Sequence, residues 1–392
     1  MTMTGYEGLV YLDFQATTPV DESVLDSMIP FFSTSFGNPS SVLHGMGRAA
    51  DKVVGIARKY VAQLIGAKPP EIVFTGSATE SINLAIQGMA RARDQQKKLR
   101  NRSRVITTAI EHKAVLEVAR ALQRTGWHVE ILPVEVSGDL DIELLTEALD
   151  EDVLLVSVQA ANQEIATVQA IERVASIAHR YGAAVHCDAS QAVGKIPIDV
   201  ETWDVDLLSF SGHKIYGPKG IGVLYVRNDA RGSGLEPLIY GGGQEYGLRS
   251  GTENVPAIVG LGQACKLAKE FLQEEGGRLK LYRDHLEELL ARSLDVKING
   301  DRDNRLPGAT SVTFKGVDAE ALIFQAPRLM LSTGSACSSG APEPSHVLTA
   351  IGLNRSDAWA TIRMSFGRPS REEDVEEAAE ALIDACRAIC SA

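Results

Sequence analysis

The chain has 392 residues, of which 44% are hydrophobic and 23% are charged. These values predict a globular, soluble protein with a large buried core and two domains. The formal net charge of −12 argues against a nucleic-acid partner, because proteins that bind nucleic acids usually present a basic face to the phosphates.

The N-terminal sequence MTMTGYEGLVYLDFQATTP lacks the positively charged start and the apolar core of a signal peptide. No stretch approaches the roughly 20 apolar residues of a membrane span. We therefore expect no membrane partner and a location in the cytoplasm or a cytoplasm-like compartment. The five cysteines have no paired short spacings, so the sequence suggests neither a disulfide framework nor a metal site.

From about residue 49 to residue 230, helical patterns alternate with short apolar strands. The strand-like runs, in chain order, are EIVFTG, RVITTAI, HVEILPV, VLLVSVQ, AAVHCDA, VDLLSFSG and IGVLYV. Such alternation predicts a mostly parallel sheet covered by helices, with ligands at the carboxyl ends of the strands.

The pattern changes after residue 257. We expect two long helices over 258–275 and 278–294, the strand TSVTFKG, another helix, the strand ATIRMSFG and a last helix from Arg371. In that last helix Cys386 and Cys390 are four residues apart, and both are expected to be small core side chains. The sequence thus predicts a smaller α+β unit packed tightly on the first.

Three strand ends carry polar residues, in TGSATES (75–81), HCDASQ (186–191) and SFSGHK (209–214). In TGSATES, small residues let backbone N–H groups approach an anion, and Thr79 and Glu80 begin a helix whose positive end favours phosphate. A plain capped helix is the alternative interpretation. Neither nucleotide-binding fingerprint is present.

Asp188 ends a very apolar strand, where an ionised carboxylate needs a cationic partner, either an arginine or a protonated ring nitrogen. Gln191 offers a second hydrogen-bonding group nearby. Lys214 also follows a strand, and a lysine in that place usually points to water. Beside a phosphate site and a buried carboxylate, however, its amine meets the needs of pyridoxal 5′-phosphate (PLP), which binds lysine as a Schiff base.

Cys337 lies in LSTGSACSSGAPEP, among Ser, Gly and Ala and without a bulky apolar neighbour. This composition is typical of a loop, whereas a free cysteine is usually buried. An incidental loop thiol is one interpretation. The predicted cofactor site favours the other, a nucleophile.

Ordered motifs along nearly the whole chain resemble the cysteine desulfurases of the NifS/IscS type, within the class V aminotransferase superfamily of PLP fold type I. The motifs are YLDFQATTP, FGNPSSVLHGMGR, TGSATESINLAI, EHKAVL, HCDASQAVGKIPID, SFSGHKIYGPKGIG, GGGQEYGLRSGTENV, STGSACSSG, EPSHVL and IRMSFGR. The resemblance implies an α/β fold with a mainly parallel seven-stranded sheet flanked by helices, and a smaller α+β C-terminal domain. The implied domains are a large PLP-binding domain over 17–257, and a small domain formed by 1–16 and 258–392 with the active-site cysteine loop at about 331–342.

The resemblance also implies roles for individual residues. Lys214 would bind PLP, Cys337 would accept sulfur, and His112 would stack on the cofactor and serve as a candidate acid or base. Asp188 would contact the ring nitrogen of PLP, and Gln191 its phenolic oxygen. The resemblance also implies contacts to the PLP phosphate from Thr79, Ser211, His213 and, from the other subunit of a homodimer, Thr252. Ala78 would contact the cofactor, Gln163 both the cofactor and the substrate, and Arg363 the substrate carboxylate.

The implied reaction converts L-cysteine to L-alanine and leaves the sulfur on Cys337 as a persulfide, for iron–sulfur cluster or other sulfur-containing cofactor biosynthesis. The sulfur would pass to an acceptor protein such as an iron–sulfur scaffold. Two motifs depart from the family: NQEIA replaces the usual NNE[IT]G, so Gln163 stands for an asparagine, and GSATE replaces SGATE. The chain also ends soon after its last helix, without the extension that longer members use to dock a scaffold, which leaves the acceptor open.

Three alternatives stand beside this interpretation. A selenocysteine lyase or a cystine/cysteine C–S lyase on the same fold would differ in whether it needs Cys337. An aminotransferase would release a keto acid instead of alanine. A non-catalytic sulfur-carrier scaffold would bind the cofactor without turnover.

Overall fold

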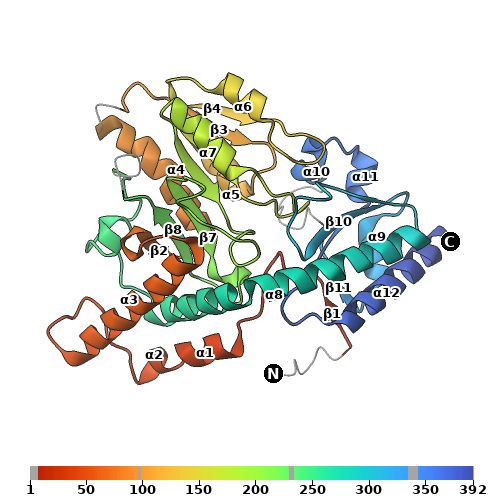
Figure 1. Ribbon diagram of the computed structural model, residues 1–392, viewed down its shortest axis with the longest axis horizontal. Coiled ribbons are helices and arrows are strands. Elements are labelled where there is room, and N and C mark those ends of the chain that lie inside the picture. Colours follow the sequence, from red (N-terminus) through yellow and green to blue (C-terminus); the bar gives the residue numbers. More distant parts are fainter. Residues whose placement is uncertain (1–7, 96–98, 229–233, 334–342, 392) are drawn as a thin grey trace.

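The computed structural model describes residues 8–95, 99–228, 234–333 and 343–391, and its larger unit is built on a seven-stranded sheet (Figure 1). The strands lie in the order β2-β8-β7-β6-β5-β3-β4, and all run in one direction except β8, which is antiparallel to both of its neighbours. Their bounds are β2 Ile72–Thr75, β3 Arg104–Thr108, β4 His128–Leu132, β5 Val153–Gln159, β6 Ala184–Asp188, β7 Leu207–Ser211 and β8 Gly222–Val226. The mainly parallel seven-stranded sheet expected from the sequence is confirmed.

Helices cover both faces of this sheet because its strands are apolar on both sides. The strands β5, β6 and β7 are buried along their whole length, as expected of a parallel sheet. One face packs against α3 (Gly45–Ile65), α7 (Ile171–Arg180) and the first half of α8 (Val255–Ser293). The other face packs against α4 (Ala78–Gln95) and α5 (Lys113–Arg124).

The parallel strands bring their carboxyl ends to one edge of the sheet. The strands β2, β6 and β7 end directly before or within the three polar motifs that the sequence singles out. The strands β3 and β5 end before the segments that carry His112 and Gln163. Five loops with polar side chains therefore converge where ligands of α/β proteins usually bind.

A second, smaller unit lies at the far end of α8 (Figure 1). Its antiparallel sheet has the order β12-β10-β9, with β9 at Val296–Ile298, β10 at Ala309–Phe314 and β12 at Thr361–Ser365. The strands β1 (Val10–Tyr11) and β11 (Leu329–Met330) pair in parallel beside it. A separate apolar cluster joins these strands to α9 (Ala319–Gln325), α12 (Glu372–Cys390) and the second half of α8.

The helix α8 differs from the sequence expectation. We expected two helices with a break near the Gly276–Gly277 pair, but one helix of 39 residues runs from Val255 to Ser293. The first half contributes Leu261 to the core of the larger unit, and the second half contributes Leu286 to the core of the smaller one. Packing at both ends therefore outweighs the cost of two glycines, about 1 kcal/mol each relative to alanine.

The division into domains at residue 258 stays a prediction. The two apolar cores support two units, but α8 belongs to both of them, and its first half packs on the larger unit.

Several short elements were not predicted from the sequence. They are α1 (Glu22–Met28), α2 (Pro30–Ser33), α6 (Ile142–Ala148), α10 (His346–Ala350) and α11 (Arg355–Trp359), together with the single-turn helices η1 (Pro69–Glu71), η2 (Gly212–Lys214) and η3 (Glu245–Gly247). Cys390 is exposed, so its expected core position was wrong, whereas Cys386 is buried as expected. Cys390 lies in the last turn of α12, past the point where that helix contacts the smaller core.

Within the described ranges, no helix has both the length and the apolar character needed to cross a bilayer. The same part of the chain contains no group of three or more His, Cys, Asp or Glu side chains that could hold a metal ion.

Replacing Gly277 by alanine should stabilise the protein. Gly277 is exposed within α8, and an added Cβ would meet no atom within 4 Å. Alanine lowers the conformational entropy of the unfolded chain without a steric cost here, so the free energy of unfolding should rise by about 0.5–1 kcal/mol. The midpoint of urea-induced unfolding measures this.

Gly262→Ala in the same helix is the matched control. Its Cβ would lie 2.6 Å from Cα of Ala57 on α3, so this variant should be less stable than the wild type. A helix broken near residue 277 would contradict the structure, and Gly277→Ala would then fail to stabilise the protein.

Candidate active site

A cavity with a volume of about 540 Å³ lies at the carboxyl ends of the parallel strands. Its size and position are typical of a small-molecule site. It brings together these residues expected from the sequence: Ala78, Thr79, His112, Gln163, Asp188, Gln191, Ser211, His213 and Lys214. Residues from five separate loops thus meet in one cavity, as the strand order requires.

Lys214 is fixed at the end of η2 by the N-terminal segment of the chain. Its Nζ donates hydrogen bonds to the main-chain oxygens of Gln15 (2.5 Å) and Ala16 (2.9 Å). The N–H of Thr18 in turn donates to the main-chain oxygen of His213, the residue before the lysine. The amine therefore lies inside the cavity and not in bulk water, which was the alternative for a lysine at a strand end.

The turn after Lys214 has an unusual backbone conformation. Tyr216 has a φ of 64°, a region that residues other than glycine rarely adopt. Its N–H donates to Oγ1 of Thr18 (2.8 Å), and its hydroxyl accepts a hydrogen bond from the N–H of Arg368 (2.5 Å). Contacts from both units thus hold the segment that carries the lysine.

Asp188 is the anionic group of the cavity. It is 5% exposed, and its Oδ1 accepts hydrogen bonds from the N–H (3.0 Å) and the hydroxyl (2.5 Å) of Ser190. Across the described ranges it forms no ion pair with an arginine or lysine. A buried carboxylate without such a partner fits a cationic ring nitrogen, as in PLP.

The other end of the cavity fits a phosphate. The 18-residue helix α4 begins there at Ala78, and the first amide groups of a helix favour an anion. Thr79, Ser211 and His213 line the same cavity. The donors and the carboxylate of the cavity therefore match the two ends of PLP.

Both histidines of the cavity have a pKa below its ordinary value. Desolvation lowers the pKa of His112, Asp188 partly opposes this, and Lys214 and Lys113 lower the pKa further. Its Nδ1 accepts a hydrogen bond from the N–H of Ala114 (3.1 Å), which leaves the ring proton on Nε2. Burial, together with Lys214 and two other lysines, lowers the pKa of His213 to about 4.

Arg363 does not line the cavity, but it contacts a residue that does. It donates from one terminal nitrogen to the main-chain oxygen of Gln163 (3.0 Å), and its other terminal nitrogen pairs with Oδ1 of Asp13 (2.6 Å). Its Nε is buried and has no hydrogen-bond partner in the described part of the chain. The guanidinium thus keeps donor capacity for a further carboxylate.

Thr252, like Arg363, does not line the cavity. Thr252 lines a separate hollow beside Glu245 and Arg249, and its expected contribution from the other subunit of a dimer stays a prediction. Cys337, and with it residues 334–342 of the predicted cysteine loop, lies outside the described residues.

Sequence reasoning missed two buried acids beside the cavity. Glu111 is fully buried, and its Oε1 accepts hydrogen bonds from the hydroxyl of Thr108 (2.8 Å) and the N–H of Gln159 (3.0 Å). Glu164 is 5% exposed and accepts a hydrogen bond from the hydroxyl of Ser345. Burial raises the pKa of Glu111 to about 8 and that of Glu164 to about 7. Glutamates are usually exposed, so the residue type alone does not predict their burial. Only their positions within the motifs EHKAVL and NQEIA could have pointed to them.

Replacing Glu111 by glutamine should change how stability depends on pH. The carboxyl titrates near 8 in the folded protein and near its ordinary 4.5 when unfolded, so the wild type loses stability as the pH rises between these values. The loss is at most about 1.4 kcal/mol per pH unit. Glu111→Gln keeps an acceptor oxygen and does not titrate, so its free energy of unfolding relative to the wild type should rise from about pH 5 to pH 8.

Urea unfolding at several pH values measures this difference. Glu147→Gln, which removes an exposed carboxyl on α6, should run parallel to the wild type. If the Glu111→Gln and wild-type curves were parallel instead, Glu111 would not hold its proton in the folded protein.

The comparisons with known proteins agree with this geometry. Residues 10–378 match the family profile described as Aminotransferase class-V. A protein named Cysteine desulfurase IscS, from Rickettsia rickettsii (strain Iowa), is 43% identical over 384 residues, which cover 97% of this chain and 92% of the relative.

Two solved structures are also similar. A NifS-like protein superposes with a TM-score of 0.88 at 39% identity, over 98% of this chain and 100% of that one. A structure described as SspA in complex with cysteine gives a TM-score of 0.80 at 40% identity, over 91% of this chain and 98% of that one. With these matches over nearly its whole length, the chain belongs to the class-V aminotransferase family and, within it, to the cysteine desulfurases.

Proposed function

We propose that this chain is a PLP-dependent enzyme that converts L-cysteine to L-alanine and keeps the sulfur on Cys337 as a persulfide. The observation that carries the proposal is the cavity in which Lys214, the buried carboxylate of Asp188 and the ring of His112 meet. Membership of the cysteine desulfurases and the cysteine-bound relative support it.

The residues of the cavity would hold PLP at five places. Lys214 would form the Schiff base, Asp188 would contact the ring nitrogen, Gln191 the phenolic oxygen and His112 the ring face. The phosphate would lie against Ala78, Thr79, Ser211 and His213. When bound, PLP supplies an electron sink that stabilises negative charge at the α-carbon of the substrate.

The chain's own groups would bind the substrate and move protons. The guanidinium of Arg363 would bind the substrate carboxylate with the donors that Asp13 and Gln163 leave free. The amine of Lys214 would take the proton from the α-carbon and return it elsewhere on the substrate. The Nε2–H of neutral His112 would remain as a hydrogen-bond donor in the cavity.

The thiolate of Cys337 would attack the sulfur of the substrate. An S–S bond forms, the C–S bond of the substrate breaks, and its electron pair stays with the carbon skeleton, which takes up protons and leaves as alanine. The sulfur would then pass to an acceptor protein, for which an iron–sulfur scaffold is our proposal. We further propose a homodimer, because Thr252 does not line the cavity of its own chain, and a cytoplasmic location.

Incubation of the purified protein with L-cysteine tests this function. Alanine, sulfide and the mass of the Cys337 peptide are measured. Alanine should form, and the peptide should gain the mass of one sulfur. 3-Mercaptopyruvate, the keto acid of cysteine, in place of alanine would favour an aminotransferase, and a yellow protein without turnover would favour a scaffold.

Cys337→Ala should keep the yellow colour of the bound cofactor but lower alanine formation by more than about 100-fold, because the acceptor of the sulfur is lost. Lys214→Ala should lose the colour of the Schiff base. Cys390→Ala, which removes the exposed cysteine of α12, should retain full activity. Full activity of Cys337→Ala would contradict the proposal and favour a C–S lyase or a selenocysteine lyase.

A further inference from the structure

The side-chain amide of Gln191 lies between a donor and an acceptor. Its Oε1 accepts a hydrogen bond from Nζ of Lys195 (3.0 Å), and its Nε2 donates to the main-chain oxygen of Gln15 (3.0 Å). Because a main-chain carbonyl can only accept, the NH₂ group of the amide must face Gln15. The amide oxygen then faces Lys195, which supplies the donor that it needs.

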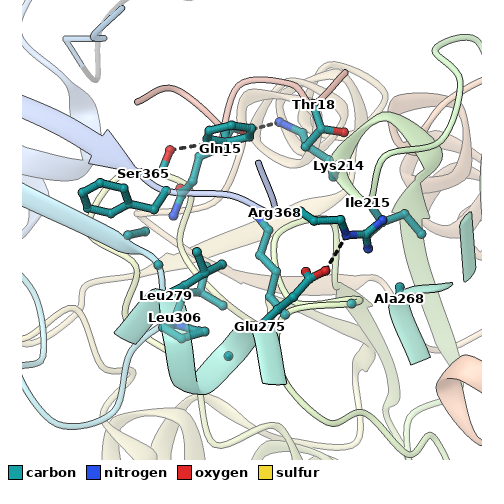
Figure 2. A pocket seen from close by; sticks show the side chains of 18 of the residues that line it. Gln15, Thr18, Lys214, Ile215, Ala268, Glu275, Leu279, Leu306, Ser365 and Arg368 are labelled. Carbon is teal, nitrogen blue, oxygen red and sulfur yellow. Dashed lines mark hydrogen bonds and ion pairs between the residues drawn. The ribbon is translucent and has the colours of Figure 1, made fainter. Parts of the chain in front are cut away.

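The oxygen of Gln15 that accepts from Gln191 also accepts from Lys214. Figure 2 shows the amine of Lys214 directed at Gln15, and the two atoms are 2.5 Å apart. The NH₂ group of Gln191 and the amine of Lys214 therefore meet at one atom. One N–H of the amide is used there, and the second is available to another acceptor in the cavity, which Gln191 lines.

Lys195 itself does not line the PLP cavity but lies in a second, mostly apolar pocket behind Lys214. The charged groups around it are Lys214, Arg363 and the Glu275–Arg368 pair, whose two members bond to each other (Figure 2). Among the described residues Lys195 forms no ion pair. Burial, together with the nearby charges of Lys214 and Arg363, lowers the pKa of its amine to about 7.

A lysine head group in such a pocket is costly, since it is desolvated beside other cations. A methionine or leucine would fill the same space without that cost. The contact that distinguishes the lysine is its hydrogen bond to the amide oxygen of Gln191.

We propose that Lys195 is a positioning residue that acts on the cofactor through Gln191. It keeps the NH₂ group of Gln191 turned toward the phenolic oxygen of PLP, so that the amide donates a hydrogen bond there. The inference rests on the proposed function and deepens it, because it gives a role to a residue that touches neither PLP nor substrate.

The proposal has a spectroscopic consequence. In the Schiff base that Lys214 would form, a donor at the phenolic oxygen would stabilise the negative charge of that oxygen and so favour loss of the Schiff-base proton. Without Lys195 the amide can turn its oxygen toward the phenolic oxygen, and the proton is then held more tightly. Hydrogen bonds to charged groups are strong enough to change this proton affinity by about tenfold, which is one pH unit.

The experiment titrates the visible absorbance of the holoenzyme against pH in the absence of substrate. Lys195→Met should raise the pKa of the Schiff base by about one unit. Lys195→Arg, which keeps a cationic donor, should titrate like the wild type. In a Gln191→Leu background, Lys195→Met should cause no further shift, because the residue acts through the amide.

Gln191→Glu provides a test that leaves the second pocket filled. It keeps an acceptor for Lys195 but has no N–H to donate, so it should raise the pKa of the Schiff base at least as much as Lys195→Met. An unchanged pKa in either variant, or an equal shift from Lys195→Met with and without Gln191, would overturn the inference and leave the proposed function intact. A wild-type protein that takes up no PLP would overturn both.

Discussion

The main-chain carbonyl of Gln15 organises the site. It accepts hydrogen bonds from Lys214, at the end of η2, and from Gln191, which follows β6. The N–H of the same residue donates to the hydroxyl of Ser365 on β12, 2.9 Å away. The backbone of one residue thus connects two loops of the larger sheet to the sheet of the smaller unit. Because a backbone carbonyl cannot be removed by a side-chain change, the position of the reactive amine depends on the path of the chain and not on one side chain.

The same N-terminal segment contacts both units and fixes their relative position at the site. Asp13 pairs with Arg363, and Thr18 binds the backbone on both sides of Lys214. The residues proposed to bind the cofactor and those proposed to bind the substrate carboxylate are therefore held against one connecting segment. A shift of that segment would move both groups together, which preserves their spacing for catalysis.

The large sheet could be predicted from the sequence because its strands, buried on both faces, appear as uninterrupted apolar runs. Asp188, Gln191 and Lys214 could be predicted to lie together because parallel strands end at one edge. The unbroken helix α8 could not be predicted in this way. Its glycine pair is a local signal for a helix end, and only the packing of both halves overrides it.

The pairing of Asp13 with Arg363 joins residues that are 350 positions apart, and no local pattern encodes it. The burial of Glu111, Glu164 and Lys195 could not be predicted for a different reason. Their residue types are exposed in most proteins, and their burial here follows from the assembled fold. The resemblance to a family indicated the role of Arg363 but gave no account of what holds it in place.

The helix α8 also determines how the two units share their stability. Each apolar core contains one half of this single rod, so the loss of either core would leave about half of the helix with its apolar side exposed to water. Unfolding of either core would therefore destabilise α8, and with it the other core. We therefore expect the two units to unfold cooperatively rather than one at a time.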